Sequence, residues 1–280
     1  MRKINGKELA QEVLSKAKLE TASLKSPPRL DIIFVGTDPA SATYVKVKAK
    51  TGKETGINVN IHRFSGQNPD VAQKIKELGA DKQCNAIIVQ LPLPKRDDKL
   101  LELIPPAKDV DGLNPLSLGK IWQNLPALVP ATPAAIMYAL EHIAKTEGNA
   151  DYLSGKTVLV INRSVVIGRP LAALLLQKDC TVTIAHSKTK NLPELLATAD
   201  IVITGTGQTG ILKKEYLKHD AVVIDAGFSI RDGKIKGDVN PDELEGKAGW
   251  LSPVPGGIGP LGVAMLLMNT VTAAKNQSGL

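Results

Sequence analysis

The sequence contains little cysteine. Cys84 and Cys180 are the only two cysteines among its 280 residues. Two isolated cysteines provide neither a disulfide framework nor the paired spacing of a structural zinc site. The four histidines are scattered, and none lies at a spacing typical of a metal site. We therefore expect a reduced, cytoplasmic protein without a bound metal.

Aromatic residues and long apolar runs are also scarce. Aromatic residues make up only 3% of the chain, so its core must consist of Leu, Ile, Val and Ala. No apolar run approaches the roughly 18–20 residues of a membrane helix. The first residues, MRKINGKELAQEV, are charged and lack the apolar centre of a secretory signal. The expectation is a globular protein with no membrane partner.

The charge is unbalanced toward lysine and arginine, with a formal net charge of +7. Such an excess is typical of proteins that bind nucleic acids or small anionic substrates. The basic residues are spread along the whole chain and form no cluster interleaved with aromatics. This pattern favours small anions and phosphates, and nucleic acid is the alternative.

Short apolar runs alternate with helical patterns along most of the chain, which predicts an α/β fold with parallel sheets. The pattern restarts after residues 122–132, so we expect two domains and a hinge there. The expected strands are 30–35, 57–63, 86–90, 156–161, 180–185, 201–204 and 221–225, and the expected helices are 7–24, 39–55, 70–79, 134–144, 171–177 and one ending near Ala274.

A row of polar side chains marks the helix that begins after Asp38. Asp38 is a favourable N-cap and Pro39 a favourable first residue, and Gly56 should end the helix. Ser41, Tyr44 and Lys48 follow at i, i+3 and i+7, so they share one face. The row is either a solvated face with one tyrosine packed down or part of a binding site.

Polar residues also follow the apolar run AIIVQ. Gln90 closes this run, as a strand cap or as a site residue, and the stiff segment LPLP follows it. Asp109 and Asp111 then lie two apart in the loop KDVDG. Ligands of parallel sheets bind beyond the carboxyl ends of the strands. We therefore expect Tyr44, Lys48, Gln90 and one of the two aspartates to converge at one edge.

The second array opens with the strand KTVLVI, the loop NRSVVIGRP and an apolar helix, which is the arrangement of a phosphate-binding crossover. Asn162 and Ser164 stand where a dinucleotide fingerprint has its first two glycines, and Asn tolerates the left-handed turn. No acidic residue follows the next strand to bond a ribose 2′-hydroxyl. Ser187 and Lys188 stand there, and with Arg163 they suit the 2′-phosphate of NADP.

Three further segments have loop signals. GTGQTG separates two strands, residues 228–238 carry an Asp-Gly turn typical of a hairpin, and SPVPGGIGPLG precedes the last helix. The last of these is rich in Gly and Pro, which suits either close approach by a ligand or an ordinary loop before a docking helix.

Five segments together resemble one family. They are VGTDPASATYVKVKAK, VQLPLP, KDVDG, RSVVIGRP and SPVPGGIGP, in this order and spread over nearly the whole chain. They are similar to those of the bifunctional methylenetetrahydrofolate dehydrogenase/cyclohydrolases. The resemblance implies a folate-binding catalytic domain, 1–125 completed by the C-terminal helix 258–280, and a Rossmann domain, 126–257.

The resemblance also implies a function. It implies NADP-dependent oxidation of 5,10-methylenetetrahydrofolate to the methenyl form and hydrolysis of that product to 10-formyltetrahydrofolate, in one-carbon metabolism and purine biosynthesis. Tetrahydrofolate derivatives and a second copy of the chain would be the partners, NADP the exchangeable cofactor, and no metal would be needed.

The resemblance assigns roles to residues of this chain. Lys48 corresponds to the catalytic lysine, Tyr44 to a tyrosine near the pterin, Gln90 to the neighbour of that lysine and Asp111 to the residue that holds the pterin. The expected substrate-binding residues are Ser41, Tyr44, Lys48, Val89, Gln90, Leu91, Asp111, Pro255, Gly256, Gly257, Ile258 and Gly259. The expected cofactor-binding residues are Asn162, Arg163, Ser164, Gly168, Ser187, Thr206, Gly207 and Phe228.

Three positions depart from the family pattern. Asn162 replaces a glycine of the cofactor loop, Ala131 stands where a cysteine commonly precedes Thr-Pro, and Gly262 stands where a threonine often follows the last loop. We therefore expect these departures to affect the affinity for the cofactor more than the type of reaction. The competing hypotheses are another two-domain Rossmann reductase, such as a relative of shikimate dehydrogenase, and a basic nucleic-acid-binding protein.

Overall fold

The computed structural model describes the chain except for residues 67–68, 96, 98, 232–233 and 280. The described chain forms two compact units. One consists of Gln11–Ala131 and Val263–Leu280, and we call it the three-stranded unit after its sheet. The other consists of Met1–Ala10 and Thr132–Gly262, and we call it the six-stranded unit. The expected two-domain α/β fold with parallel sheets is confirmed.

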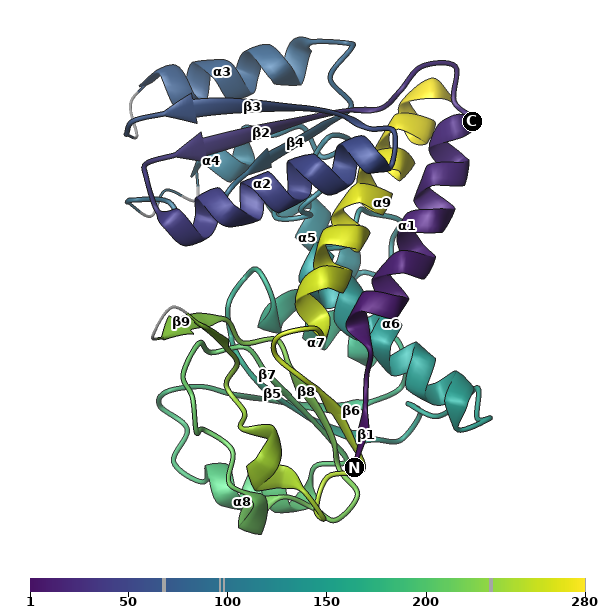
Figure 1. Ribbon diagram of the computed structural model, residues 1–280, viewed down its shortest axis with the longest axis vertical. Helices are drawn as coiled ribbons and strands as arrows, with labels where there is room; N and C mark the ends of the chain where they lie inside the picture. The colour runs from purple at the N-terminus through teal and green to yellow at the C-terminus, as the bar shows by residue number, and fades with distance from the viewer. Residues whose placement is uncertain (67–68, 96, 98, 232–233, 280) are drawn as a thin grey trace. The chain divides into compact units, whose positions relative to one another are not determined.

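The sheet of the three-stranded unit is parallel and has the order β3-β2-β4. Its strands are β2 (Arg29–Val35), β3 (Asn58–Phe64) and β4 (Ala86–Val89). Helices α2 (Pro39–Glu54) and α3 (Pro69–Ala80) lie on opposite faces of the sheet (Figure 1). The carboxyl ends of β2 and β4 therefore meet at one edge, beside the start of α2.

Helix α2 begins and ends as its local sequence predicts. The Asp38 side chain accepts a hydrogen bond from the Ser41 backbone N–H at 2.7 Å, and Pro39 occupies the first turn. At the other end Gly56 takes a φ of +85°, which an L-residue with a side chain rarely adopts. These caps fix where α2 starts relative to β2 and hence where its polar row lies.

Helix α9 (Ile258–Ser278) completes the core of the three-stranded unit. Leu266, Leu267 and Val271 are buried against strand residues such as Leu30 and Ile32. By length and composition alone, α9 is the kind of helix that could cross a membrane, with 21 residues and a mean hydropathy of 1.2. This corrects the expectation that the chain has no apolar run long enough for a membrane helix. The buried side chains of α9 pack as those of a core helix do.

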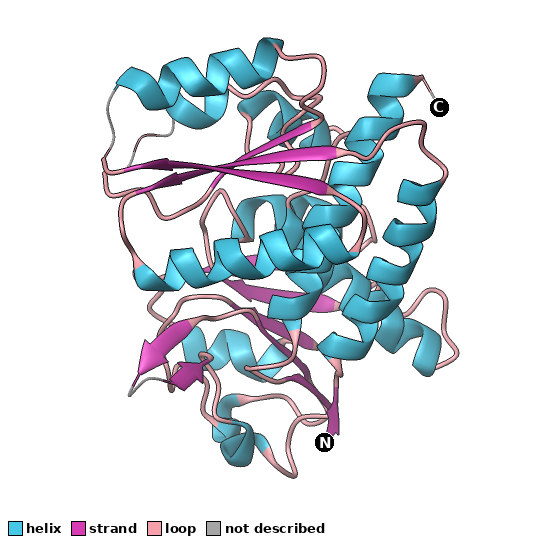
Figure 2. Cartoon of the chain, turned by 45° about the horizontal axis from the view of Figure 1, so that its top comes forward, coloured by secondary structure: helices cyan, strands magenta, loops and turns pink. Residues whose placement is uncertain are grey.

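The sheet of the six-stranded unit has the order β1-β11-β8-β7-β5-β6 and is parallel throughout (Figure 2). Its strands are β1 (Arg2–Lys3), β5 (Thr157–Ile161), β6 (Thr181–Ala185), β7 (Ile201–Thr204), β8 (Val222–Asp225) and β11 (Trp250–Ser252). Pairing of β1 with β11 explains why residues 1–10 pack with this unit. The domain boundaries 1–125 and 126–257 stay a prediction.

The other elements differ modestly from expectation. Helix α6 begins at Ala131, before Thr132-Pro133, because a proline in the first helical turn removes no intrahelical hydrogen bond. The hairpin strands are present, but their Asp-Gly turn at 232–233 lies outside the described residues. The remaining elements are α1 (Gly6–Ala22), α4 (Lys99–Glu102), α5 (Pro115–Trp122), α6 (Ala131–Thr146), α7 (Gly168–Leu176), α8 (Leu192–Thr198), β9 (Ser229–Arg231), β10 (Lys234–Lys236) and the 3-10 turns η1 (Lys214–Tyr216) and η2 (Pro241–Leu244).

Candidate active site

Lys48 and Gln90 meet at the carboxyl edge of the three-stranded sheet. Lys48 Nζ donates to Gln90 Oε1 at 3.0 Å. The Gln90 amide is held on its other side, because its Nε2 donates to the Leu91 carbonyl at 2.7 Å and its backbone N–H donates to Ile33 at 2.9 Å. The amide oxygen is thus fixed toward the lysine as a neutral acceptor.

Of the two aspartates after β4, Asp109 supports the loop. It forms an isolated parallel bridge with Ile87, and its carboxylate accepts from the Asn114 backbone N–H at 2.7 Å. Gly112 turns the chain at φ +66°, close against the Leu128 carbonyl. The charges of Asp111 and Lys48 act on each other, as the causes of their pKa shifts show. The assignment of Asp111 to the site stays a prediction.

Burial brings the ionisable groups of this site toward their neutral forms. It lowers the pKa of Lys48, and the charge of Asp111 opposes that shift. It raises the pKa of Asp111, and the charge of Lys48 opposes that shift in turn. Burial also raises the pKa of Asp109 to about 6, although backbone N–H groups of Asn114 and Leu113 favour its ionised form. A lysine with a lowered pKa gives up its proton more readily than an ordinary lysine does.

The other expected substrate residues of this unit differ in accessibility. Tyr44 is half-buried, and burial raises the pKa of its phenol, so it stays a neutral ring with a hydroxyl. Ser41 is only 4% exposed, and its backbone N–H donates to the Asp38 cap. Val89 is buried in β4, whereas Leu91 is partly exposed in the loop that follows. Substrate contact by these residues stays a prediction.

Asn162 organises the crossover loop of the six-stranded unit. Its Oδ1 accepts from the backbone N–H groups of Ser164 at 2.8 Å and Gly168 at 3.1 Å, and from the Ser164 hydroxyl. Its Nδ2 donates to the Gly205 carbonyl at 2.6 Å. Asn162 therefore ties the loop to the start of α7 and to the loop after β7. Where the family has a flexible glycine, Asn162 instead fixes the loop through the hydrogen bonds of its side chain.

Gly168 is the close-approach glycine of this crossover. A Cβ placed on it would overlap the Asn162 carbonyl, so a side chain has no room there. Strand β5, this tight loop and the N-terminus of α7 form the strand-loop-helix cradle that suits a dinucleotide pyrophosphate. The residues present therefore fit NADP. Beside this cradle, Arg163 lies exposed in the loop, and Ser187 lies exposed after β6.

Sequence reasoning missed two buried carboxylates beneath the remaining cofactor candidates. Thr206 and Gly207 lie in the loop after β7, and a Cβ on Gly207 would lie 3.3 Å from the Phe228 carbonyl. Asp238, which is fully buried, accepts from the Thr206 backbone N–H, and Asp225 holds the turn that precedes Phe228 through the Gly227 N–H. Apolar alternation carries no signal for such contacts, because they join loops distant in sequence.

The expected substrate loop 255–259 belongs to the six-stranded unit up to its junction with α9. Gly257 packs so closely that a Cβ there would overlap the Ser252 hydroxyl, and Gly6 packs against the Gly257 carbonyl. Gly256 has a φ of +101°. Ile258 is buried, and Gly259 has open space around it. Gly256 and Gly257 are required by the fold of the loop itself, and contact of the loop with substrate stays a prediction.

The cysteines are not nucleophiles. Both are free and buried, and burial raises the pKa of Cys84 to about 12 and that of Cys180 to about 11. Within the described ranges, no three His, Cys, Asp or Glu side chains are grouped as a metal site.

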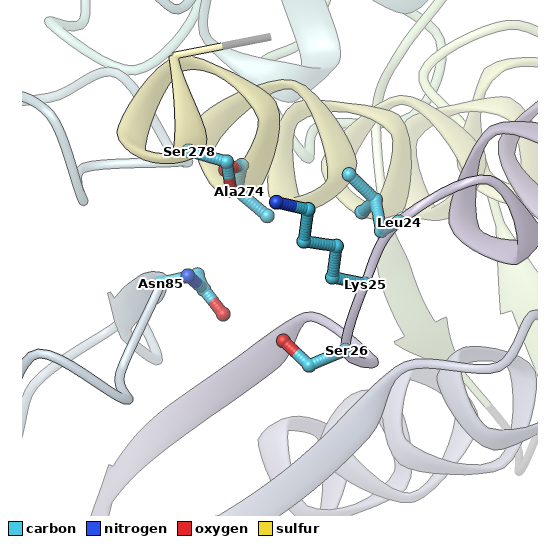
Figure 3. A pocket seen from close by; sticks show the side chains of 6 residues that line it. All are labelled: Leu24, Lys25, Ser26, Asn85, Ala274 and Ser278. Carbon is cyan, nitrogen blue, oxygen red and sulfur yellow. The ribbon is translucent and has the colours of Figure 1, made fainter.

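A small pocket lies away from the Lys48 edge. Figure 3 shows its lining residues at the start of β4, in the turn after α1 and near the end of α9: Leu24, Lys25, Ser26, Asn85, Ala274 and Ser278. These positions border the amino ends of β2 and β4, whereas substrates of parallel sheets bind at the carboxyl ends. The pocket is therefore separate from the Lys48 site.

Comparison with known proteins assigns both parts of the chain. Residues 4–111 match the model of the tetrahydrofolate dehydrogenase/cyclohydrolase catalytic domain, and residues 130–278 match that of its NAD(P)-binding domain. The chain is 41% identical to the bifunctional protein FolD of Lactobacillus gasseri, over 99% of this chain and 98% of that one.

Solved structures agree with this assignment. The bifunctional enzyme FolD of Campylobacter jejuni superposes with a TM-score of 0.92 at 36% identity, over 99% of each chain. The Trypanosoma brucei methylenetetrahydrofolate dehydrogenase-cyclohydrolase, complexed with NADP cofactor and inhibitor, superposes with a TM-score of 0.91 at 32% identity, over 99% of this chain and 98% of that one. These findings favour a folate enzyme over a shikimate dehydrogenase relative or a nucleic-acid-binding protein. The chain belongs to the tetrahydrofolate dehydrogenase/cyclohydrolase family.

Proposed function

We propose that Lys48 is the proton-transferring residue of a bifunctional methylenetetrahydrofolate dehydrogenase/cyclohydrolase. The chain oxidises 5,10-methylenetetrahydrofolate to the methenyl form with NADP and hydrolyses the methenyl compound to 10-formyltetrahydrofolate. The observation that carries the assignment is the part-buried Lys48 Nζ–Gln90 Oε1 hydrogen bond of 3.0 Å. Formation of the methenyl compound with NADP and with NAD, and its hydrolysis without either, test both activities on the purified protein.

The surroundings of Lys48 suit an exchangeable proton. Hydrolysis requires removal of a proton from the attacking water and its return to the leaving nitrogen. Gln90 accepts a hydrogen bond from either form of the amine, because its amide is neutral and fixed. A carboxylate in direct contact would hold the lysine as ammonium, and burial opposes that. Lys48 can therefore serve as base and then as acid in the same site.

Asp111 is proposed to hold the pterin. The amidine-like edge of a pterin offers adjacent N–H donors, which a carboxylate accepts as a pair. Each of the charges on Asp111 and Lys48 opposes the pKa shift that burial causes in the other. The pterin bound there would bring the one-carbon group of the folate toward the lysine.

Replacing Asp111 by alanine should weaken folate binding by about 1.5–3 kcal/mol, the usual contribution of a hydrogen bond to a charged group. Equilibrium binding of a folate to the purified variant measures the loss. NADP binding is the internal control and should stay unchanged, because the cofactor candidates belong to the other unit. Loss of both binding events would indicate misfolding and leave no support for the pterin contact.

The six-stranded unit is proposed to hold NADP, which accepts a hydride from the methylene carbon when bound. The Ser164 and Gly168 region and the N-terminus of α7 would bind the pyrophosphate, and the Thr206–Gly207 and Phe228 loops would border the rest of the cofactor. Arg163 and Ser187 are exposed beside this cradle and would bind the 2′-phosphate. No metal is required by either step.

Arg163→Ala tests the choice of NADP over NAD. One charge-assisted contact contributes about 1.5–3 kcal/mol, or roughly 10- to 150-fold in affinity. The variant should raise the KM for NADP by about that factor and leave activity with NAD nearly unchanged. Lys213→Ala removes one exposed positive charge in the same unit and is the matched control. Equal losses with both cofactors would mean that Arg163 shapes the loop and does not contact the phosphate.

The assembly and location of the enzyme are also proposals. A homodimer and a cytoplasmic role in purine biosynthesis follow from the resemblance to the family. The exposed Ile230 and Ile235 of the β9–β10 hairpin are compatible with a subunit contact, since exposed apolar side chains on a paired hairpin favour association.

A further inference from the structure

Asp238 is a buried carboxylate that hydrogen-bonds the end of β7 and the loop after it. Its side chain is fully buried in the six-stranded unit. Its Oδ2 accepts from the Thr204 hydroxyl at 2.5 Å, the Thr206 backbone N–H at 2.6 Å and the Thr206 hydroxyl at 2.9 Å. Its own backbone carbonyl accepts from the Gly210 N–H at 2.9 Å. Asp238 therefore contacts this loop at its beginning, middle and end.

A second carboxylate, Asp225, holds the segment that carries Asp238. Asp225 follows β8 and accepts from the Val239 backbone N–H at 2.9 Å and from the Gly227 N–H at 2.8 Å. Burial raises the pKa of Asp225 to about 6, and the Asp238 charge adds to that shift. Burying two carboxylates costs free energy, and their hydrogen bonds hold the surrounding loops in fixed positions.

The neighbouring glycine shows how tightly these loops are packed. A Cβ at Gly227 would overlap the Asp238 carboxylate, so only glycine fits there. Gly227 directly precedes Phe228, and a Cβ at Gly207 would lie 3.3 Å from the Phe228 carbonyl. Asp238 thus lies under both the Thr206–Gly207 loop and the Phe228 turn.

We propose that Asp238 is a positioning residue for NADP: it does not contact the cofactor, and it sets cofactor affinity by fixing the Thr206–Gly207 loop. The inference depends on the proposed NADP site and identifies a determinant of that site. Backbone N–H groups bind phosphates and nicotinamide amides well only when their directions are fixed beforehand. Three donors on one buried carboxylate oxygen provide that fixation, because they hold the Thr204 hydroxyl and both polar groups of Thr206 at one point.

Asp238→Asn tests the charge with almost no change of shape. The amide oxygen can keep the position of Oδ2, and among the described residues Oδ1 makes no hydrogen bond, so the amide nitrogen that replaces it breaks none. We expect the dissociation constant of NADP, measured by titration of the purified full chain, to rise roughly 10-fold. Hydrolysis of the methenyl compound needs no NADP and should stay within about twofold of wild type. Asp242→Asn removes an exposed carboxylate of the same unit and should change neither quantity.

A double-mutant cycle with Thr206→Val shows whether Asp238 acts through the loop. If it does, the losses in NADP affinity of the two variants should not add, because both remove the same contact. Additive losses, an unchanged NADP affinity in Asp238→Asn, or an equal loss of NADP affinity and hydrolysis would each overturn the proposal. A wild-type protein that binds no NADP would instead refute the proposed cofactor site.

Discussion

Lys48→Met should slow hydrolysis of 5,10-methenyltetrahydrofolate by about 10²–10⁴-fold, the usual contribution of general acid–base catalysis. Methionine keeps most of the length and packing of the lysine stem but carries no exchangeable proton. Folate binding should therefore remain measurable. The rate of methenyl hydrolysis without added NADP reports the loss directly, since no redox step intervenes.

Two further variants isolate the role of the amine. Lys50→Met alters an exposed lysine of the same helix and should leave hydrolysis unchanged. Lys48→Arg keeps a positive charge but cannot lose its proton, because a guanidinium stays charged in proteins. It should be nearly as slow as Lys48→Met. Hydrolysis within about threefold of wild type in either Lys48 variant would exclude Lys48 as the proton-transferring group.

Gly168→Ala should reduce NADP-dependent oxidation by more than about 100-fold. The added Cβ would overlap the backbone carbonyl of Asn162, and a backbone atom cannot move aside as a flexible side chain can. Relief requires the crossover loop or the start of α7 to shift. Because the Gly168 N–H also donates to Asn162 Oδ1, the shift would break this hydrogen bond as well. The loss should appear as a raised dissociation constant for NADP.

The hydrolysis rate distinguishes a local from a global effect of Gly168→Ala. It should remain near wild type, because Lys48 and Gln90 belong to the other unit. Gly119→Ala is the matched control: Gly119 lies in α5 with open space around it, and alanine favours a helix over glycine. Normal NADP affinity in Gly168→Ala would show that this crossover does not bind the pyrophosphate.

Local signals explain which elements the sequence predicts. The Asp38-Pro39 start and Gly56 stop of α2 act within one helical turn, so the prediction is confirmed at both ends. Helix α5 carries the same signal, because Asn114 caps it and Pro115 begins it. It was missed because its eight residues hold too little periodicity to add to that cap. Strands β1 and β11 were missed for another reason: they are two and three residues long and depend on pairing with each other.

The site likewise has parts that the sequence predicts and parts that only the structure shows. Lys48 and Gln90 could be placed together from sequence, since both follow carboxyl ends of strands in one parallel sheet. For Asp109, the structure adds the bridge to Ile87 and the bond to Asn114. The resemblance implied Ser41 as a substrate contact, and the structure adds that its backbone N–H donates to Asp38. Contacts such as Asp238 with Thr206 join segments that no sequence period connects.

The path of the chain limits how this protein can be cut or recombined. The backbone passes from one compact unit to the other after Ala10, after Ala131 and after Gly262. Neither unit is therefore a single uninterrupted stretch of sequence. A fragment ending at Ala131 would lack Leu266, Leu267 and Val271, which fill the core behind the Lys48 sheet, and a fragment starting at Thr132 would lack the β1 edge strand. A cut at Ala131 would therefore disturb the core of one unit and the sheet of the other.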